Sequence, residues 1–194
     1  MVSYLFVAGA RPVQLHDVAP IGPGGWVRLP PGDPGRRATR EVVASGLGGV
    51  CASAAVTAAE LAALAAALAE AEEAVGLAVG QIAVMPAVET AAGVLGAAEL
   101  AHAPRVARLL LAEAPLRAEL RLRPGPDERE LLWLRSMVVA ASAAAGIAPP
   151  VADVCPDPGR FVESSAALAR LGFGGRLCAG EEQLKLAGEI FDYA

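Results

Sequence analysis

The most constraining feature of the sequence is an apolar run at residues 81–88 that is followed by one acidic residue, Glu89. The run begins after Gly80 and carries almost no polar side chain, which is typical of a strand buried on both faces of a parallel sheet. Thr90 comes next and can cap a helix that begins at Ala91. The sequence therefore predicts a carboxylate at the C-terminal end of a buried strand, where parallel α/β proteins bind ligands and metals.

The rest of the chain predicts strands that alternate with helices. Short apolar runs indicate strands at residues 3–8, 25–29, 50–52, 81–88, 106–111, 151–155 and 176–179. Periodic apolar patterns and capping residues indicate helices at about 34–44, 57–75, 91–102, 127–146, 161–171 and 181–191. Residues 10–25 hold three prolines and three glycines and are interpreted as a loop. About seven strands in this order predict a parallel sheet with right-handed crossovers, in one domain over residues 1–194.

Charge and hydropathy exclude several classes of partner. The formal net charge of −5 and the pI near 5.1 argue against nucleic acid, whose binding proteins present a basic face. The most apolar stretch, residues 137–152, is interrupted by serine, glycine and proline and is shorter than the roughly 20 residues that span a bilayer. The N-terminus lacks the pattern of a signal peptide, so no membrane partner and a cytoplasmic location are expected.

Two further patterns have simple structural interpretations. The three cysteines, Cys51, Cys155 and Cys178, show no CxxC spacing, which predicts reduced, buried thiols. Glu70, Glu72 and Glu73 lie close together late in a predicted helix, and this acidic cluster is interpreted as a solvated face.

Four segments carry a resemblance to a known family. Residues 86–95 read Pro-Ala-Val-Glu-Thr-Ala-Ala-Gly-Val-Leu, and residues 4–12 read Tyr-Leu-Phe-Val-Ala-Gly-Ala-Arg-Pro. Residues 26–30 read Trp-Val-Arg-Leu-Pro, and residues 171–176 read Leu-Gly-Phe-Gly-Gly-Arg. These segments resemble four elements of the citrate lyase beta subunit and HpcH/HpaI aldolase family. Residues 86–95 resemble its ET-x-x-G segment and residues 4–12 its opening strand. Residues 26–30 resemble its VRVN strand and residues 171–176 its late LGF-x-GK element. The resemblance implies a TIM barrel and a carbon–carbon lyase or aldolase that acts on a keto acid or its acyl-CoA adduct.

The resemblance also accounts for the length of the chain, since 194 residues are few for a barrel that typically has about 250. Family members place a helix, a strand and a second helix where residues 10–25 stand. We therefore expect an α/β, TIM-barrel-like domain that is truncated, with one helix-strand-helix block missing after strand 1. An incomplete barrel exposes strand edges and apolar surface, which a second copy of the chain would cover, so a homo-oligomer is expected.

The family site implies roles for three residues of this chain. Two family carboxylates hold a Mg²⁺ that grips the keto acid and stabilises the enolate, and Glu89 matches the first of them. Pro115 stands at the position of the second, and Glu113, two residues earlier, is the nearest alternative metal ligand. Arg28 matches the arginine that binds a substrate carboxylate, a task that suits its forked guanidinium. Glu89 and Arg28 are the candidate catalytic residues.

Other family positions have lost their reactive groups. Pro30, Ala54 and Gly180 stand where the family has an asparagine, a lysine and a histidine. Each retained residue also has a structural alternative. Glu89 can stabilise the following helix through its dipole, and Arg28 can pair with a surface acid.

Three hypotheses follow. The first is an active Mg²⁺-dependent lyase with Glu89 on the metal and Arg28 on a carboxylate. The second is a catalytically inactive relative that serves as a ligand-binding or assembly subunit, which is favoured because a lone carboxylate is a poor Mg²⁺ cage. The third is an enzyme of changed chemistry in which Glu113 or Glu181 replaces lost groups.

Overall fold

The structure is a computed structural model that describes residues 2–7, 13–16, 25–29, 43, 47–53 and 57–192, with the backbone alone for the first two ranges. The described strands are β1 (Val2–Val7), β2 (Val13–His16), β3 (Trp26–Leu29), β4 (Gly49–Ala52), β5 (Ala83–Val88), β6 (Leu110–Leu111), β7 (Val151–Ala152) and β8 (Gly175–Cys178). The helices are α2 (Ala58–Ala74), α3 (Ala91–Leu95), α4 (Ala97–Ala101), α5 (Glu113–Glu119), α6 (Leu132–Ala144), α7 (Phe161–Leu171) and α8 (Glu181–Phe191). Two 3₁₀ turns, η1 (Arg129–Leu131) and η2 (Pro158–Arg160), precede α6 and α7.

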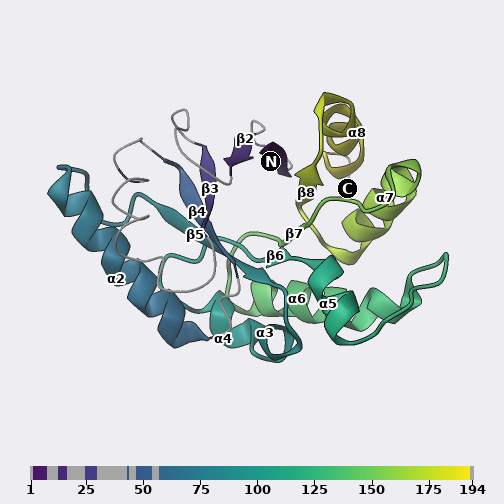
Figure 1. Cartoon of the computed structure of the whole chain (residues 1–194), viewed down its shortest axis with the longest axis horizontal. Coiled ribbons are helices and arrows are strands. Elements are labelled where there is room, and N and C mark those ends of the chain that lie inside the picture. Colours follow the sequence, from purple (N-terminus) through teal and green to yellow (C-terminus); the bar gives the residue numbers. More distant parts are fainter. Residues whose placement is uncertain are drawn as a thin grey trace.

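The described strands form one curled sheet in chain order. Each strand from β2 to β8 pairs with the next in parallel, and β1 pairs with both β2 and β8, so these strands close into a barrel. Figure 1 shows the helices on the outer side of the curled sheet, with α2 along one flank and α7 and α8 at the other. The predicted TIM-barrel-like alternation of strands and helices is confirmed.

The first strand departs from the prediction of a uniformly parallel sheet. β1 runs antiparallel to both of its neighbours, and β2 lies within residues 10–25, which the sequence indicated as loop. Only residues 8–12 separate β1 from β2, and a parallel connection needs a dozen residues or more, so the two strands pair as antiparallel neighbours. The open sheet edge on which the expected homo-oligomer rested is therefore occupied by β1, and oligomerisation stays a prediction.

Several elements are shorter than predicted. The strand expected at 106–111 is paired only at β6, with an isolated bridge between Val84 and Val106. The helix expected at 91–102 divides at Gly96 into α3 and α4. The helix expected at 34–44 lies outside the described residues except Val43, which is helical.

The core has two layers, one on each face of the sheet. The inner cluster fills the barrel and comprises Cys51, Met85, Ala87, Leu110, Val151 and Leu177, with Trp26 packed against it. The outer cluster joins the sheet to the helices through the alternate residues of the same strands, such as Val27, Val50, Val84 and Leu111. Gly49 is required beside the inner cluster, because a Cβ there would lie 2.7 Å from the Trp26 ring. Burial on both faces explains why these strands read as continuous apolar runs.

Helix α2 confirms one prediction and corrects another. Thr57 and Glu60 form the predicted capping box at its start. Glu72, however, is fully buried, and it does not belong to a solvated acidic face. It lies one turn beyond Leu68 on the buried stripe of α2, so the helical period turns it toward the sheet.

The predicted thiols are found buried and free at Cys51, Cys155 and Cys178. In the part of the chain that the structure describes, no helix combines the length and the apolar character that crossing a bilayer requires.

Candidate active site at the carboxyl ends of the strands

The inner face of the barrel gathers the predicted site residues at one end. Side chains alternate between the faces of a strand, so Arg28 shares the inner face with Trp26, and Glu89 follows Met85 and Ala87. Arg28 is paired in register with Cys51 on β4. Both Arg28 and Glu89 are half-buried, at the carboxyl end of a strand.

The pKa of the Cys51 thiol indicates which charged groups lie near the barrel mouth. Burial raises its pKa to about 12, the positive charge of Arg28 lowers it, and the negative charges of Asp153 and Glu89 raise it further. All three charged groups therefore lie within electrostatic reach of one buried sulfur atom. Arg28, Glu89 and Asp153 thus all act on a thiol at the barrel mouth, and the catalytic role of Arg28 and Glu89 stays a prediction.

Asp153 was not identified from the sequence as a site residue, although it lies in the predicted strand at 151–155. The pairings of Ala87 with Leu110 and of Leu110 with Val151 continue two residues further, which aligns Glu89, Ala112 and Asp153 in one row. Neighbouring strands lie about 4.8 Å apart, so roughly 10 Å separate the backbones that carry the two carboxylates. Ala112, whose side chain is a methyl group, lies between them in this row. The signal in the sequence was an aspartate directly after an apolar strand.

Glu113 forms an ion pair with an arginine of α6. It begins α5, and its two carboxylate oxygens accept hydrogen bonds from Arg135 Nε at 2.6 Å and Arg135 Nη2 at 3.0 Å. Pro115 lies inside α5 and offers no side-chain donor atom. Glu181 is exposed in the first turn of α8. The family positions at Pro30 and Ala54 lie outside the described residues.

Two other side chains bind amides at the start of α3. The Thr90 hydroxyl accepts a hydrogen bond from the Gly93 amide at 3.0 Å, and Glu119 of α5 accepts one from the Ala91 amide at 2.8 Å. These two side chains satisfy amides that a helix leaves unpaired at its N-terminus.

Comparison with known proteins decides the family. The family model described as HpcH/HpaI aldolase/citrate lyase matches residues 5–180. The chain belongs to this family. Its curated relatives include the citrate lyase subunit beta of Leuconostoc mesenteroides subsp. cremoris, which is 30% identical over 138 residues that cover 70% of this chain and 46% of the relative. The citrate lyase subunit beta of Escherichia coli K12 is 28% identical over 62% of this chain and 41% of its own length. The chain thus spans less than half the length of these relatives.

Solved structures of other proteins share the fold. RipC from Yersinia pestis matches with a TM-score of 0.73 at 17% identity, over 87% of this chain and 76% of its own. Protein CitE from Mycobacterium tuberculosis, crystallised with magnesium and acetoacetate, matches with a TM-score of 0.66 at 22% identity, over 86% of this chain and 67% of its own. The same CitE protein was also crystallised with magnesium, acetoacetate and coenzyme A.

The donor atoms of this HpcH/HpaI family member fit a hard cation better than a soft one. Among the described residues, no three His, Cys, Asp or Glu side chains are arranged to hold a metal together. Mg²⁺ needs only one or two protein carboxylates, because water and substrate oxygens complete its six ligands. Glu89 and Asp153 face the same mouth and supply two such carboxylates.

Proposed function

We propose that this chain is a carbon–carbon lyase of the oxo-acid type, which binds Mg²⁺ and a keto acid or its acyl-CoA adduct at the carboxyl ends of its strands. The observation that carries the proposal is the convergence of Arg28, Glu89 and Asp153 on the Cys51 thiol. Two carboxylates and one guanidinium at the mouth of a barrel match the charges of a metal-bound keto acid. The magnesium and acetoacetate in the relative from Mycobacterium tuberculosis support the same chemistry.

In this proposal each of the three residues has one task. Glu89 and Asp153 would provide the protein ligands of Mg²⁺, in place of the carboxylate that is lost at Pro115. When bound, Mg²⁺ supplies a Lewis acid that stabilises the negative charge of the substrate oxygens as the carbon–carbon bond breaks. Arg28 binds the substrate carboxylate through its forked donors and holds the substrate in register with the two acids.

Glu113 stays an untested prediction as a metal ligand. Its hydrogen bonds to the almost fully buried Arg135 would have to break or be shared before the carboxylate turned toward the mouth. Asp153 needs no such rearrangement, because it already lies near Cys51 together with Glu89.

A second candidate is a ligand-binding or assembly subunit without turnover. Cys51, whose pKa all three charges affect, keeps its proton because burial raises that pKa to about 12. It therefore offers no general base, and a lyase needs a group that moves a proton. This candidate keeps the metal and the carboxylate site but lacks the chemical step.

The proposal is tested by magnesium and oxaloacetate binding to the whole chain, followed by thermal unfolding and isothermal calorimetry. We expect Mg²⁺ to raise the melting temperature of the wild-type chain, and oxaloacetate to raise it further only when Mg²⁺ is present. Glu89→Gln and Asp153→Asn remove one charge each without changing shape, and either change should abolish the Mg²⁺ effect. Arg28→Gln should keep the Mg²⁺ effect and lose the oxaloacetate effect. The matched control is Glu99→Gln, because Glu99 is exposed. This variant should keep both the Mg²⁺ effect and the oxaloacetate effect on the melting temperature.

The chemical step separates the two candidates. Mg²⁺-dependent cleavage of citryl or malyl thioesters that Glu89→Gln abolishes supports the lyase. Binding without cleavage supports the ligand-binding subunit. A wild-type chain whose melting temperature responds to neither Mg²⁺ nor oxaloacetate would overturn the shared site.

A further inference from the structure

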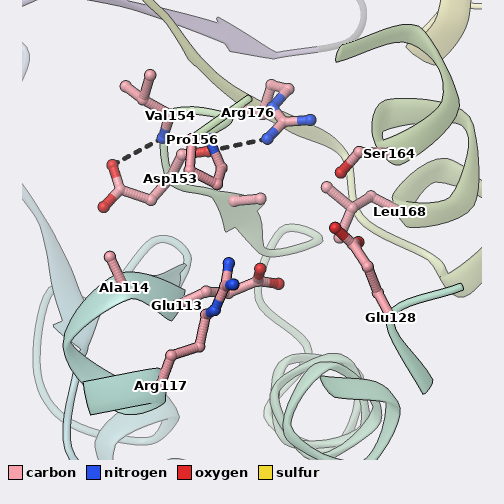
Figure 2. A pocket seen from close by; sticks show the side chains of 11 residues that line it. Glu113, Ala114, Arg117, Glu128, Asp153, Val154, Pro156, Ser164, Leu168 and Arg176 are labelled. Atoms are coloured by element: carbon pink, nitrogen blue, oxygen red, sulfur yellow. Dashed lines mark hydrogen bonds between the residues drawn. The ribbon is translucent and has the colours of Figure 1, made fainter. Parts of the chain in front are cut away.

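A second pocket lies beside the barrel mouth, on the outer side of the sheet. Figure 2 shows it between the start of α5, the turn that carries Glu128, the carboxyl end of β7 and the helix α7. It holds about 420 Å³ of space, part of which is open to solvent. Arg176 of β8 lines this pocket from the outer face, because the next residue along β8, Leu177, belongs to the inner cluster. The pocket shares Asp153 with the barrel mouth, but neither Arg28 nor Glu89 lines it.

The pocket acids Glu113 and Glu128 are already neutralised. Arg135 binds Glu113 through Nε and Nη2, and it binds Glu128 through Nη2 at 2.8 Å. Arg160 adds a second contact to Glu128, at 3.3 Å. Two carboxylates are thus matched by two guanidinium groups, in a network whose central arginine is only 2% exposed. The network forms one wall of the pocket and contributes little net charge.

Asp153 is the third acid that lines the pocket, and its carboxylate points away from the Arg176 guanidinium. Its Oδ1 accepts a hydrogen bond from the amide of Val154 at 2.8 Å. Figure 2 shows this contact on the side of the strand end away from the Arg176 guanidinium, which reaches the Asp153 main-chain oxygen instead. The charge of the Asp153 carboxylate is felt by the Cys51 thiol inside the barrel.

Arg176 is a buried cation without an acid partner among the described residues. Only 3% of the residue is exposed, and its polar partners are neutral, the Ser165 hydroxyl at 2.8 Å and the Asp153 carbonyl at 3.3 Å. Its Nε–H is buried and has no acceptor within the described part of the chain. The Phe161 ring lies 4.9 Å from the guanidinium carbon and contributes a weak cation–π contact. Burial lowers the pKa of Arg176 and outweighs the opposing effect of nearby negative charge, that of Glu113 included.

A second arginine faces the same pocket. Arg117 of α5 is half-buried in the lining, and no ion pair joins it to an acid in the described part of the chain. A buried, uncompensated charge is costly, and a guanidinium recovers that cost best through two hydrogen bonds to one oxyanion. The buried Ser164 also lines the pocket.

We propose that this pocket binds an anionic oxygen group, a carboxylate or a phosphate, between Arg117 and Arg176. The anion would take the place of the missing acid partner of both arginines. The site does not depend on the proposed lyase chemistry, because none of its arginines lies at the barrel mouth and no metal is required.

The test is a calorimetric titration of the whole chain with inorganic phosphate and, separately, with malonate, without Mg²⁺ and at ionic strength held constant with chloride. We expect saturable binding of at least one of these two probes. Stronger binding of phosphate identifies a phosphoryl group as the natural occupant, and stronger binding of malonate identifies a carboxylate. Arg117→Gln should weaken binding about tenfold, which corresponds to about 1.4 kcal/mol. Arg176→Lys keeps the positive charge but loses the paired N–H donors of the guanidinium, and it should weaken binding by a similar factor.

The control variant is Arg123→Gln, which removes an exposed arginine that does not line the pocket and should leave the affinity unchanged. A wild-type chain that binds neither probe beyond the effect of chloride would overturn the proposal. Equal affinities for wild type, Arg117→Gln and Arg176→Lys would also overturn it. Repeating the titration with Glu89→Gln separates the two sites, because loss of metal binding at the mouth should leave the pocket affinity intact.

Discussion

Glu72 of α2 and Arg105, which lies 33 residues later, form a two-pronged ion pair with contacts of 3.0 Å and 2.8 Å. The Glu72 carboxylate is fully buried and also accepts hydrogen bonds from the amides of Gly80 and Ile82, each at 2.8 Å. One side chain thus joins the end of α2, the approach to β5 and the turn before β6. Glu72 thereby stabilises the end of the barrel opposite the candidate active site.

Replacing Glu72 by glutamine should therefore destabilise the fold. The change leaves Arg105 without its counter-charge and weakens the acceptors of two amides, and breaking a buried pair typically costs about 3–5 kcal/mol. Urea unfolding measures the loss of unfolding free energy. Glu70→Gln, an exposed change on the same helix, should stay within about 0.5 kcal/mol of wild type. An equal effect of the two substitutions would contradict the role of the ion pair.

The same carboxylate predicts how stability depends on pH. Burial alone would raise the pKa of Glu72, but hydrogen bonds from Arg105, Gly80 and Ile82 outweigh it and lower the pKa from 4.5 to about 2. Since the folded-state pKa lies below the unfolded value, the stabilisation is complete above pH 4.5 and is lost as the pH falls toward 2. It amounts to the order of 3 kcal/mol. Wild type should lose this stability between pH 5 and pH 2, whereas Glu72→Gln should not.

Arg135 should matter more to stability than any exposed ion pair. Replacement by methionine keeps most of the volume but leaves Glu113 and Glu128 close together without their shared cation, which should cost about 3–5 kcal/mol. The control is Arg129→Gln, because Arg129 is 78% exposed where it pairs with Asp127, and such pairs are worth about 0–1 kcal/mol. Chemical denaturation of both variants tests the contrast, and a small effect for Arg135→Met would refute it.

The thiols should be unreactive while the chain is folded. Burial raises the pKa of both Cys51 and Cys178 to about 12, so almost no reactive thiolate exists at pH 8. Iodoacetamide at pH 8 should label neither residue in native conditions and both in urea, as mass spectrometry of the peptides would show. Rapid labelling of native Cys51 would mean that the barrel interior is open to solvent.

Much of the fold was predictable because burial on both faces leaves a simple signal. The runs that became β4 and β5 are apolar at consecutive positions, since alternate residues of each strand enter the two core clusters. The predicted bounds of α7 and α8 match the structure for a similar reason, because these helices carry clear apolar periodicity. The short strand β2 was missed because proline and glycine surround it.

The candidate site was predictable only in part. The family resemblance located Arg28 and Glu89, and both act on the Cys51 thiol. Asp153 was overlooked because its importance depends on register, which aligns it with Glu89 across Ala112 and which a single strand does not disclose. Glu72 was misassigned because one acidic residue on a buried stripe resembles its exposed neighbours until Arg105 is placed beside it.

The pairing of β1 with β8 has a consequence for how the chain folds. Tyr4 stands opposite Cys178, so the last seam of the sheet joins segments from the two extremes of the sequence. Contacts of such long separation demand the largest loss of chain entropy before they form. We expect the segment from β3 to β8 to assemble first and the N-terminal hairpin to dock last, as the step that seals the cylinder.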